Sequence, residues 1–235
     1  MTDIVMTDIV MADVVLHQWE VSPFCAKVRR ILEHKSISYR VKNYHGIYAP
    51  LAAWLTPAGK LPVLDIDGER IQDSRAIARY LEEHYPQNPL IPQRDDECAA
   101  MEIWQDWADE SLYWYNFYFR LEYDDSWRKV ARCFAEGRPA YEEWIVRLFG
   151  RSKYRRQLRG QGLGRQSKTA VDARFQLLMN ALDVHLRGRD FIVGQHKTLA
   201  DIAVGSQLHE MLRTSNHAGA LIEKSVDVSR WLLSV

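Results

Sequence analysis

The Asp67-Gly68 pair separates an apolar run at 61–66 from a short segment at 69–71 that ends in Ile71. Asp-Gly favours the positive backbone angles of a two-residue turn between antiparallel strands, so the two runs are predicted to form a β-hairpin. Apolar residues then recur at helical spacing after Ser74. A chain with this pattern must build a β-β-α unit into its fold.

A β-α-β unit is predicted ahead of the hairpin. Residues 14–19, VVLHQW, have the β-branched and aromatic content of a strand. Ser22-Pro23 then provides a helix cap with proline at the first helical position. Residues 38–44 alternate like a second strand. The first part of the chain is therefore expected to be α/β.

Three prolines in residues 86–93 indicate a linker between domains. No strand pattern follows it, and helices are expected over 94–121, about 126–149, 168–186 and 199–213. The predicted organisation is an α/β domain over 12–85, the linker at 86–93 and an all-helical domain over 94–235.

The first fifteen residues repeat a five-residue unit three times, MTDIV-MTDIV-MADVV. Aspartates interrupt the repeat and no basic segment precedes it, so it does not resemble a secretory signal. Residues 1–11 are predicted to be a disordered leader.

Charge and cysteine content exclude several classes of protein. Lys and Arg equal Asp and Glu at 31 each, which argues against a polyanionic partner such as nucleic acid. The three cysteines are too widely spaced for a disulfide framework or a zinc site and fit a reducing compartment. No apolar run approaches the ~20 residues that span a bilayer. We therefore expect a cytoplasmic protein without a metal, a membrane segment or a nucleic-acid partner.

Three segments of the first domain carry a specific family resemblance. They are Ser22-Pro23-Phe24-Cys25, Gly59-Lys60-Leu61-Pro62-Val63-Leu64 and Gln72-Asp73-Ser74-Arg75-Ala76-Ile77. In order and spacing they resemble the S-P-F, G-K-[VI]-P-x-L and [ED]-S-R-A-I segments of serine-type glutathione S-transferases. The resemblance implies a thioredoxin-like domain that binds glutathione, followed by a helical domain that shapes a second site.

Glutathione is the cosubstrate that this resemblance implies, and Ser22 is the candidate catalytic residue. A hydroxyl beside a helix N-terminus stabilises a thiolate by a hydrogen bond and by the helix dipole. The alternative is that Ser22 only caps its helix. The expected glutathione-binding residues are Phe24, Lys60, Leu61, Pro62, Asp73 and Ser74.

Each of these binding residues has an expected partner in glutathione. The resemblance implies a cis bond before Pro62, with the Leu61 backbone pairing with the cysteinyl part of glutathione. The start of the following helix suits the γ-glutamyl end, with Ser74 near the carboxylate and Asp73 near the ammonium. Lys60 suits the glycyl carboxylate. The alternatives are a solvated charge at Lys60 and simple helix capping at Asp73 and Ser74.

Cys25 aligns with the second cysteine of a glutaredoxin C-P-x-C turn, while Ser22 occupies the position of the attacking cysteine. The dithiol mechanism therefore lacks its first thiol. We expect Cys25 to pack as a small apolar residue. A redox role in a mixed disulfide with glutathione is the alternative.

The helical domain offers a capping box and a group of aromatic residues. Thr198 and Asp201 precede an apolar run in a capping-box pattern, to which we assign a structural role. The candidates for lining an apolar substrate pocket are Trp19, Trp107, Trp114 and Tyr115. Aromatic residues at helical spacing more often belong to a core.

Residues 147–168 are basic and contain no acidic side chain. Nucleic-acid binding is one interpretation; we favour a solvated loop compensated by the acidic residues 95–97. The G-Q-G-L-G sequence at 160–164 lacks the preceding strand of a dinucleotide-binding loop. With the S-L-Y-W segment at 111–114, it resembles the metaxin and failed-axon-connections proteins, many of which have no established transferase activity.

The expected function is that of an enzyme that conjugates glutathione to a small apolar electrophile. One alternative is a non-catalytic binding or adaptor protein on the same scaffold, and another is a glutathione-dependent thiol-disulfide reductase acting through Cys25. Detoxification and homodimer formation are what the resemblance implies. The identity of the electrophile is not written in the sequence.

Overall fold

The computed structural model describes residues 14–235, and the repeated leader at 1–11 lies outside the described residues. The first domain contains a four-stranded mixed sheet in the order β2-β1-β3-β4. The strands are β1 Val15–Gln18, β2 Arg40–Asn43, β3 Val63–Ile66 and β4 Glu69–Gln72. β1 pairs in parallel with β2 and antiparallel with β3, and β3 and β4 form the predicted hairpin.

Two helices of this domain begin at the residues that the sequence indicates. In α1, Pro23–His34, Ser22 is the N-cap, and Val28, Ile31 and Leu32 are fully buried. In α2, Ser74–His84, Asp73 caps the helix by accepting hydrogen bonds from the backbone N–H groups of residues 75 and 76. A 3₁₀ helix, η1 Gly46–Trp54, connects β2 to β3.

The rest of the chain is helical, which confirms the expected fold class. The helices up to the middle of this domain are α3 Asp95–Asp106, η2 Trp107–Leu112, α4 Tyr113–Glu122, α5 Asp124–Phe134, α6 Ala140–Ile145 and η3 Val146–Gly150. Those that follow are α7 Arg151–Gln161, η4 Leu163–Arg165, α8 Lys168–His185, α9 Leu199–Thr214, α10 Asn216–Ile222 and α11 Val226–Leu232. The η2 and η3 segments are π-helical turns.

The expected single helix over about 126–149 is wrong. The chain forms α5 and α6 instead, with a turn between them that contains Gly137, which has a φ of 72°, and Pro139. A positive φ suits glycine, and proline cannot donate the hydrogen bond that a continuous helix would require. The two residues together end one helix and start the next.

The expected solvated loop at 147–168 is also wrong, because most of it forms α7. Arginine, lysine, glutamine and leucine favour helix, and the segment contains no proline. Its charges are not compensated by residues 95–97. Arg151 pairs with Asp124 and Arg155 with Glu122, both near the end of α4.

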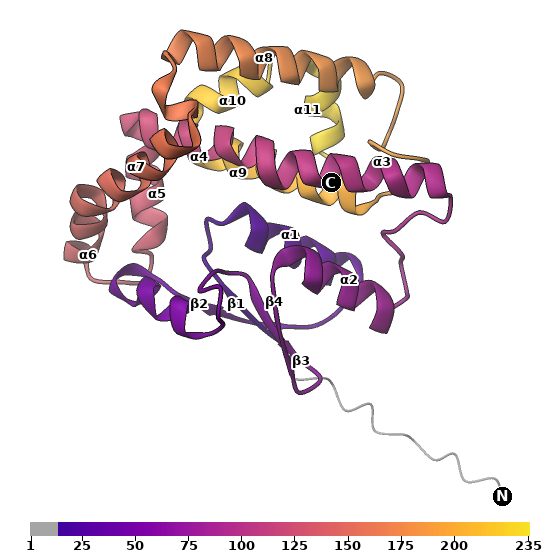
Figure 1. Cartoon of the computed structure of the whole chain (residues 1–235), viewed down its shortest axis with the longest axis horizontal. Helices are drawn as coiled ribbons and strands as arrows, with labels where there is room; N and C mark the ends of the chain where they lie inside the picture. The colour runs from indigo at the N-terminus through magenta and orange to yellow at the C-terminus, as the bar shows by residue number, and fades with distance from the viewer. Residues whose placement is uncertain (1–13) are drawn as a thin grey trace, which may run out of the picture.

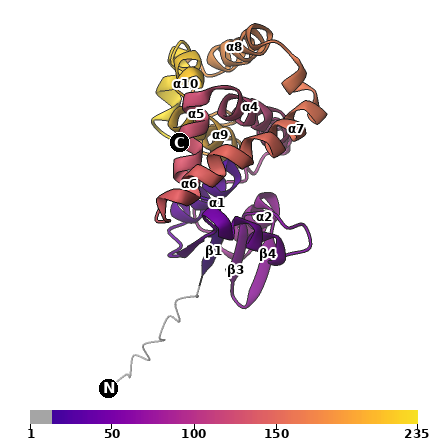
Figure 2. The same cartoon turned by 90° about the vertical axis from the view of Figure 1, so that its left-hand side faces the viewer.

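The two domains meet along α1 and α9, and Figure 1 shows α1 between the sheet and α9. In Figure 2, α6 reaches down toward the first domain. In the turn between α5 and α6, the Glu136 carbonyl oxygen lies 2.8 Å from the His45 ring of the first domain. Within residues 14–235, no helix is both long enough and apolar enough to cross a membrane.

Candidate functional site

The register of the sheet brings the three motif segments to one edge. His17 on β1 is paired with Val63 on β3, which is paired with Gln72 on β4. The segments that continue the chain beyond these paired residues are therefore neighbours. They are the loop from β1 to Ser22, Leu61-Pro62 before β3, and Asp73-Ser74 after β4. Segments that are far apart in sequence thus form one surface at the N-termini of α1 and α2.

Ser22 lies at the start of α1 and is 9% exposed. Its backbone N–H donates to the Trp19 carbonyl at 3.0 Å, and its Oγ accepts from the Cys25 N–H at 3.4 Å. The hydroxyl proton is not used in that cap. Ser22 can therefore cap the helix and still donate a hydrogen bond to a ligand at the positive end of the helix dipole.

The peptide bond between Leu61 and Pro62 is cis, as the resemblance implies. Leu61 is 6% exposed, yet neither its backbone N–H nor its C=O is hydrogen-bonded within residues 14–235. Nearly all buried backbone polar groups in proteins find a partner. The Leu61 backbone therefore offers a donor and an acceptor suited to an extended peptide-like ligand.

The start of α2 provides the third part of the site. Ser74 is 4% exposed, and its hydroxyl makes no hydrogen bond within the described part of the chain. Asp73 has a φ of 80°, a left-handed conformation that is costly for a residue other than glycine. The Asp73 carboxylate is exposed and already caps α2, so capping and ligand binding are compatible there. Lys60 is an exposed side chain close in sequence to Leu61.

Cys25 lies one turn below Ser22 and is fully buried. Burial raises the pKa of its thiol to about 11. It packs with Leu61 and Val63 beneath the site, as an apolar residue would. A nucleophilic cysteine needs an accessible thiolate, so this environment favours packing over the redox alternative.

We predict that Cys25 resists alkylation in the folded protein. At pH 8, a thiol with a pKa near 11 is a thiolate in roughly one molecule in a thousand. Iodoacetamide should modify the half-buried Cys133 first, and Cys25 only after urea unfolds the chain. Mass spectrometry of digested samples measures both rates, and equal rates in the folded protein would contradict this account of Cys25.

The four aromatic pocket candidates lie in different environments. Tyr115 is 4% exposed and packs against Phe175 in the core of the helical domain. Trp107 and Trp114 are half-buried and contact Trp104 and Tyr113, respectively. Trp19 packs against Phe134 of α5, and its indole nitrogen is buried without a partner among the described residues. Of the four, Trp19 lies nearest to Ser22 in the chain.

Sequence reasoning missed Tyr113, the first residue of α4. Its ring lies 5.0 Å from that of Phe24, measured between centroids. It therefore brings an aromatic surface of the helical domain to the residue next to Pro23. The only feature of the sequence that pointed to Tyr113 was its position two residues before Tyr115 in the same aromatic run.

A buried ion cluster also escaped the sequence analysis. The Lys27 ammonium on α1 lies 2.9 Å from Asp109, and the Arg75 guanidinium on α2 lies 3.3 Å from the same carboxylate. Burial lowers the pKa of Lys27, while Asp109 opposes that effect. Asp109 lies in the η2 turn, so one carboxylate of the helical domain ties together the helices that carry Ser22 and Ser74. Within residues 14–235, no group of acidic, histidine or cysteine side chains is arranged to hold a metal ion.

Comparison with known proteins shows what the first domain is similar to. Residues 16–89 match the family model described as the N-terminal domain of glutathione S-transferases. This part of the chain is similar to the glutathione S-transferase superfamily. The match covers the sheet and all three motif segments.

Relatives and solved structures of the superfamily extend this likeness over most of the chain. An isoprene-epoxide–glutathione S-transferase of Rhodococcus sp. (strain AD45) is 27% identical over 195 residues, covering 82% of this chain and 81% of the relative. Glutathione S-transferase U7 of Arabidopsis thaliana is 24% identical over 222 residues, covering 92% and 79%. The crystal structure of the beta-etherase LigF from Sphingobium sp. strain SYK-6 has the same fold, with a TM-score of 0.67, 20% identity and coverage of 94% and 93%. The serine-type and metaxin-like resemblances stay predictions.

Proposed function

We propose that this protein is a glutathione transferase that conjugates glutathione to a small apolar electrophile. The observation that carries the proposal is the unpaired Leu61 backbone in an otherwise buried residue, at the edge where the N-termini of α1 and α2 meet. A peptide ligand with a thiol and an amino-acid head group fits those three features. Relatives named as glutathione transferases support the same assignment.

In this proposal, each part of glutathione meets one segment. The Leu61 N–H and C=O pair with the cysteinyl backbone, and Lys60 attracts the glycyl carboxylate. The N-terminus of α2 and the Ser74 hydroxyl bind the γ-glutamyl carboxylate, and Asp73 binds the neighbouring ammonium. Pro62 and Phe24 shape the surface against which the ligand rests.

Ser22 is the proposed catalytic residue. Its hydroxyl donates a hydrogen bond to the glutathione sulfur, and with the α1 dipole it favours loss of the thiol proton to solvent. The thiolate then attacks an electrophilic carbon. With an epoxide, the new C–S bond forms as the C–O bond breaks, and the released oxygen takes a proton from water.

The electrophile is proposed to bind above Ser22, between the two domains. Tyr113, Phe24 and Trp19 place aromatic surface there, while the polar groups are reserved for glutathione. Epoxides are the first class to test, because a relative that covers most of the chain is named for an isoprene epoxide.

We expect calorimetric titration to detect binding of glutathione to the wild-type protein, and binding of cysteinylglycine at least about 10-fold more weakly. The shorter ligand lacks the γ-glutamyl group and would leave the N-terminus of α2 unused. Turnover with small epoxides and with a chromogenic electrophile is then measured at saturating glutathione. Absence of glutathione binding would overturn the proposed site. Binding without any turnover would instead favour the non-catalytic adaptor.

A further inference from the structure

We propose that Arg120 and Glu210 of the helical domain are positioning residues that fix Ser22 in its working orientation. This inference rests on the proposed function of Ser22. Neither residue belongs to the motif segments, and neither was singled out by the sequence.

Arg120 on α4 is 8% exposed and reaches the loop that precedes α1. One guanidinium nitrogen, Nη1, donates to the Val21 carbonyl at 2.7 Å. The other nitrogens are held from behind: Nε donates to Thr214 Oγ1 at 3.0 Å, and Nη2 to Glu210 Oε2 at 3.1 Å. The planar guanidinium thus has a defined direction, which a lysine ammonium could not reproduce.

The contact to Val21 matters because the Val21 carbonyl and the Ser22 N–H belong to one rigid peptide unit. Fixing the carbonyl oxygen therefore fixes the plane from which the Ser22 side chain projects. The other side of that plane is held by the bond from the Ser22 N–H to the Trp19 carbonyl. Without Arg120, the described contacts of Ser22 are this turn, the long 3.4 Å cap to Cys25 and the bond that its carbonyl accepts from the Ala26 N–H at 2.9 Å. Neither of the last two holds the peptide plane between Val21 and Ser22.

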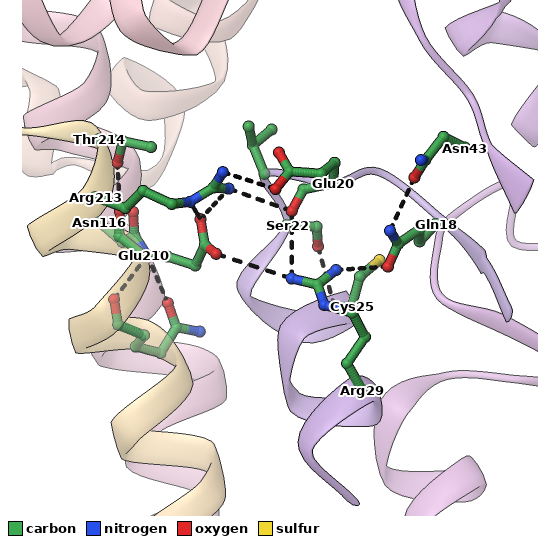
Figure 3. Close-up of polar contacts among 12 residues, drawn as sticks. Gln18, Glu20, Ser22, Cys25, Arg29, Asn43, Asn116, Glu210, Arg213 and Thr214 are labelled. Carbon is green, nitrogen blue, oxygen red and sulfur yellow. Dashed lines mark hydrogen bonds and ion pairs between the residues drawn. The ribbon is translucent and has the colours of Figure 1, made fainter. Parts of the chain in front are cut away.

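Glu210 on α9 contacts two further arginines besides Arg120. Its carboxylate also accepts from Arg213 at 2.8 Å and lies 4.0 Å from Arg29 on α1. Arg213 in turn donates to the Glu20 side chain at 2.7 Å and to the Glu20 carbonyl at 3.3 Å. Figure 3 shows Glu210 reaching from α9 toward Arg29 and Arg213, beside the loop that carries Glu20 and Ser22. The carbonyl groups of both residues before Ser22 are thereby bound to arginines.

The balance of charge in this network suits a thiolate. Three guanidinium groups, those of Arg29, Arg120 and Arg213, surround two carboxylates, those of Glu20 and Glu210. Arg120 and Glu210 are buried, so solvent screens their charges little, whereas Arg29, Arg213 and Glu20 are partly exposed. The network can therefore both orient the Ser22 hydroxyl and favour a negative sulfur beside it.

The test compares Arg120→Lys with Arg79→Lys. Both changes keep the positive charge and remove the guanidinium fork, but Arg79 pairs with Glu102 in an exposed contact between α2 and α3. Hydrogen–deuterium exchange of the peptide covering residues 19–25 is measured with and without glutathione. Because a hydrogen bond to a charged group is lost, we expect exchange there to rise about 10-fold in Arg120→Lys and to stay unchanged in Arg79→Lys.

Turnover provides the second readout. We expect Arg120→Lys to lower kcat by about 10-fold and to leave glutathione affinity within about 3-fold, since the Leu61 and α2 contacts are untouched. Arg213→Gln, at a half-exposed site, should raise exchange of the same peptide by a smaller factor. If Arg120→Lys does not fold, Arg213→Gln still tests whether the arginine network orders residues 19–25.

Unchanged exchange at residues 19–25 in a folded variant would overturn the positioning role. An equal rise in a peptide covering residues 63–72 would also overturn it, because that pattern indicates general destabilisation. If exchange rises locally but the wild-type protein neither binds glutathione nor turns it over, the proposed function fails and the positioning of Ser22 stands.

Discussion

Ser22→Ala should lower kcat/KM with an electrophilic substrate by about 100-fold while glutathione still binds. The loss is comparable to that from removing one hydrogen-bond donor that stabilises charge in a transition state. The affinity is expected to persist because the Leu61 backbone and the N-terminus of α2 supply most of the proposed contacts. A pH titration of thiolate absorbance in the ultraviolet should show that the pKa of bound glutathione is higher in the variant.

Ser167→Ala is the matched control for this substitution. Ser167 caps α8 by accepting from the Ala170 N–H at 3.2 Å, so it has the same structural role as Ser22 and lies in the helical domain. Both variants should lose about 1 kcal/mol of stability from the missing cap. Only Ser22→Ala should lose activity. Equal activity in the two variants would reduce Ser22 to a helix cap.

Asp201→Ala is expected to have the largest effect on stability of the changes considered. Asp201 is fully buried, and its carboxylate accepts hydrogen bonds from the Ile192 and Thr198 N–H groups, the Thr198 hydroxyl and the Trp231 indole. Alanine would leave these donors unsatisfied, at about 1–3 kcal/mol for each buried group. We expect a total loss of about 4 kcal/mol, a large part of the stability of an ordinary domain.

Thermal unfolding measures this loss as a lower midpoint, by roughly 10 °C for a chain of this size. Asp190→Ala is the control, because Asp190 is 87% exposed and lies 3.5 Å from Arg230. That change should leave the midpoint almost unmoved. A midpoint for Asp201→Ala within 2 °C of the control, on the order of the smallest shift worth interpreting, would show that other groups or water replace the carboxylate.

Much of the fold could be predicted because its determinants are local. Asp67-Gly68 defines the hairpin, Ser22-Pro23 starts α1, and Thr198 with Asp201 forms a capping box at α9. Each depends on residues within four positions of one another. The α5–α6 break was also encoded locally, by Gly137 and Pro139, but apolar spacing on both sides obscured it.

The contacts that connect the domains could not be predicted in the same way. Lys27 and Asp109 are 82 residues apart, and Arg120 and Glu210 are 90 apart. A charged residue on an apolar helix face, such as Lys27 one turn before Ile31, signals a buried partner but does not identify it. The sheet register, which brings the motif segments together, likewise depends on pairing between distant strands.

The π-helical turn η2 has a consequence for how this protein tolerates insertions and deletions. A π turn holds one more residue than the α-helical turn it replaces. Deleting one residue from 107–112 would therefore allow α3 and α4 to join as one regular helix and would leave the rotation of α4 nearly unchanged. A deletion inside α3 would instead rotate everything after it by about 100°, which would turn Tyr113 away from Phe24 and Arg120 from Val21. The π turn thus accommodates its extra residue without changing the rotational phase of α4, so a single-codon deletion there should be far less harmful than one in α3.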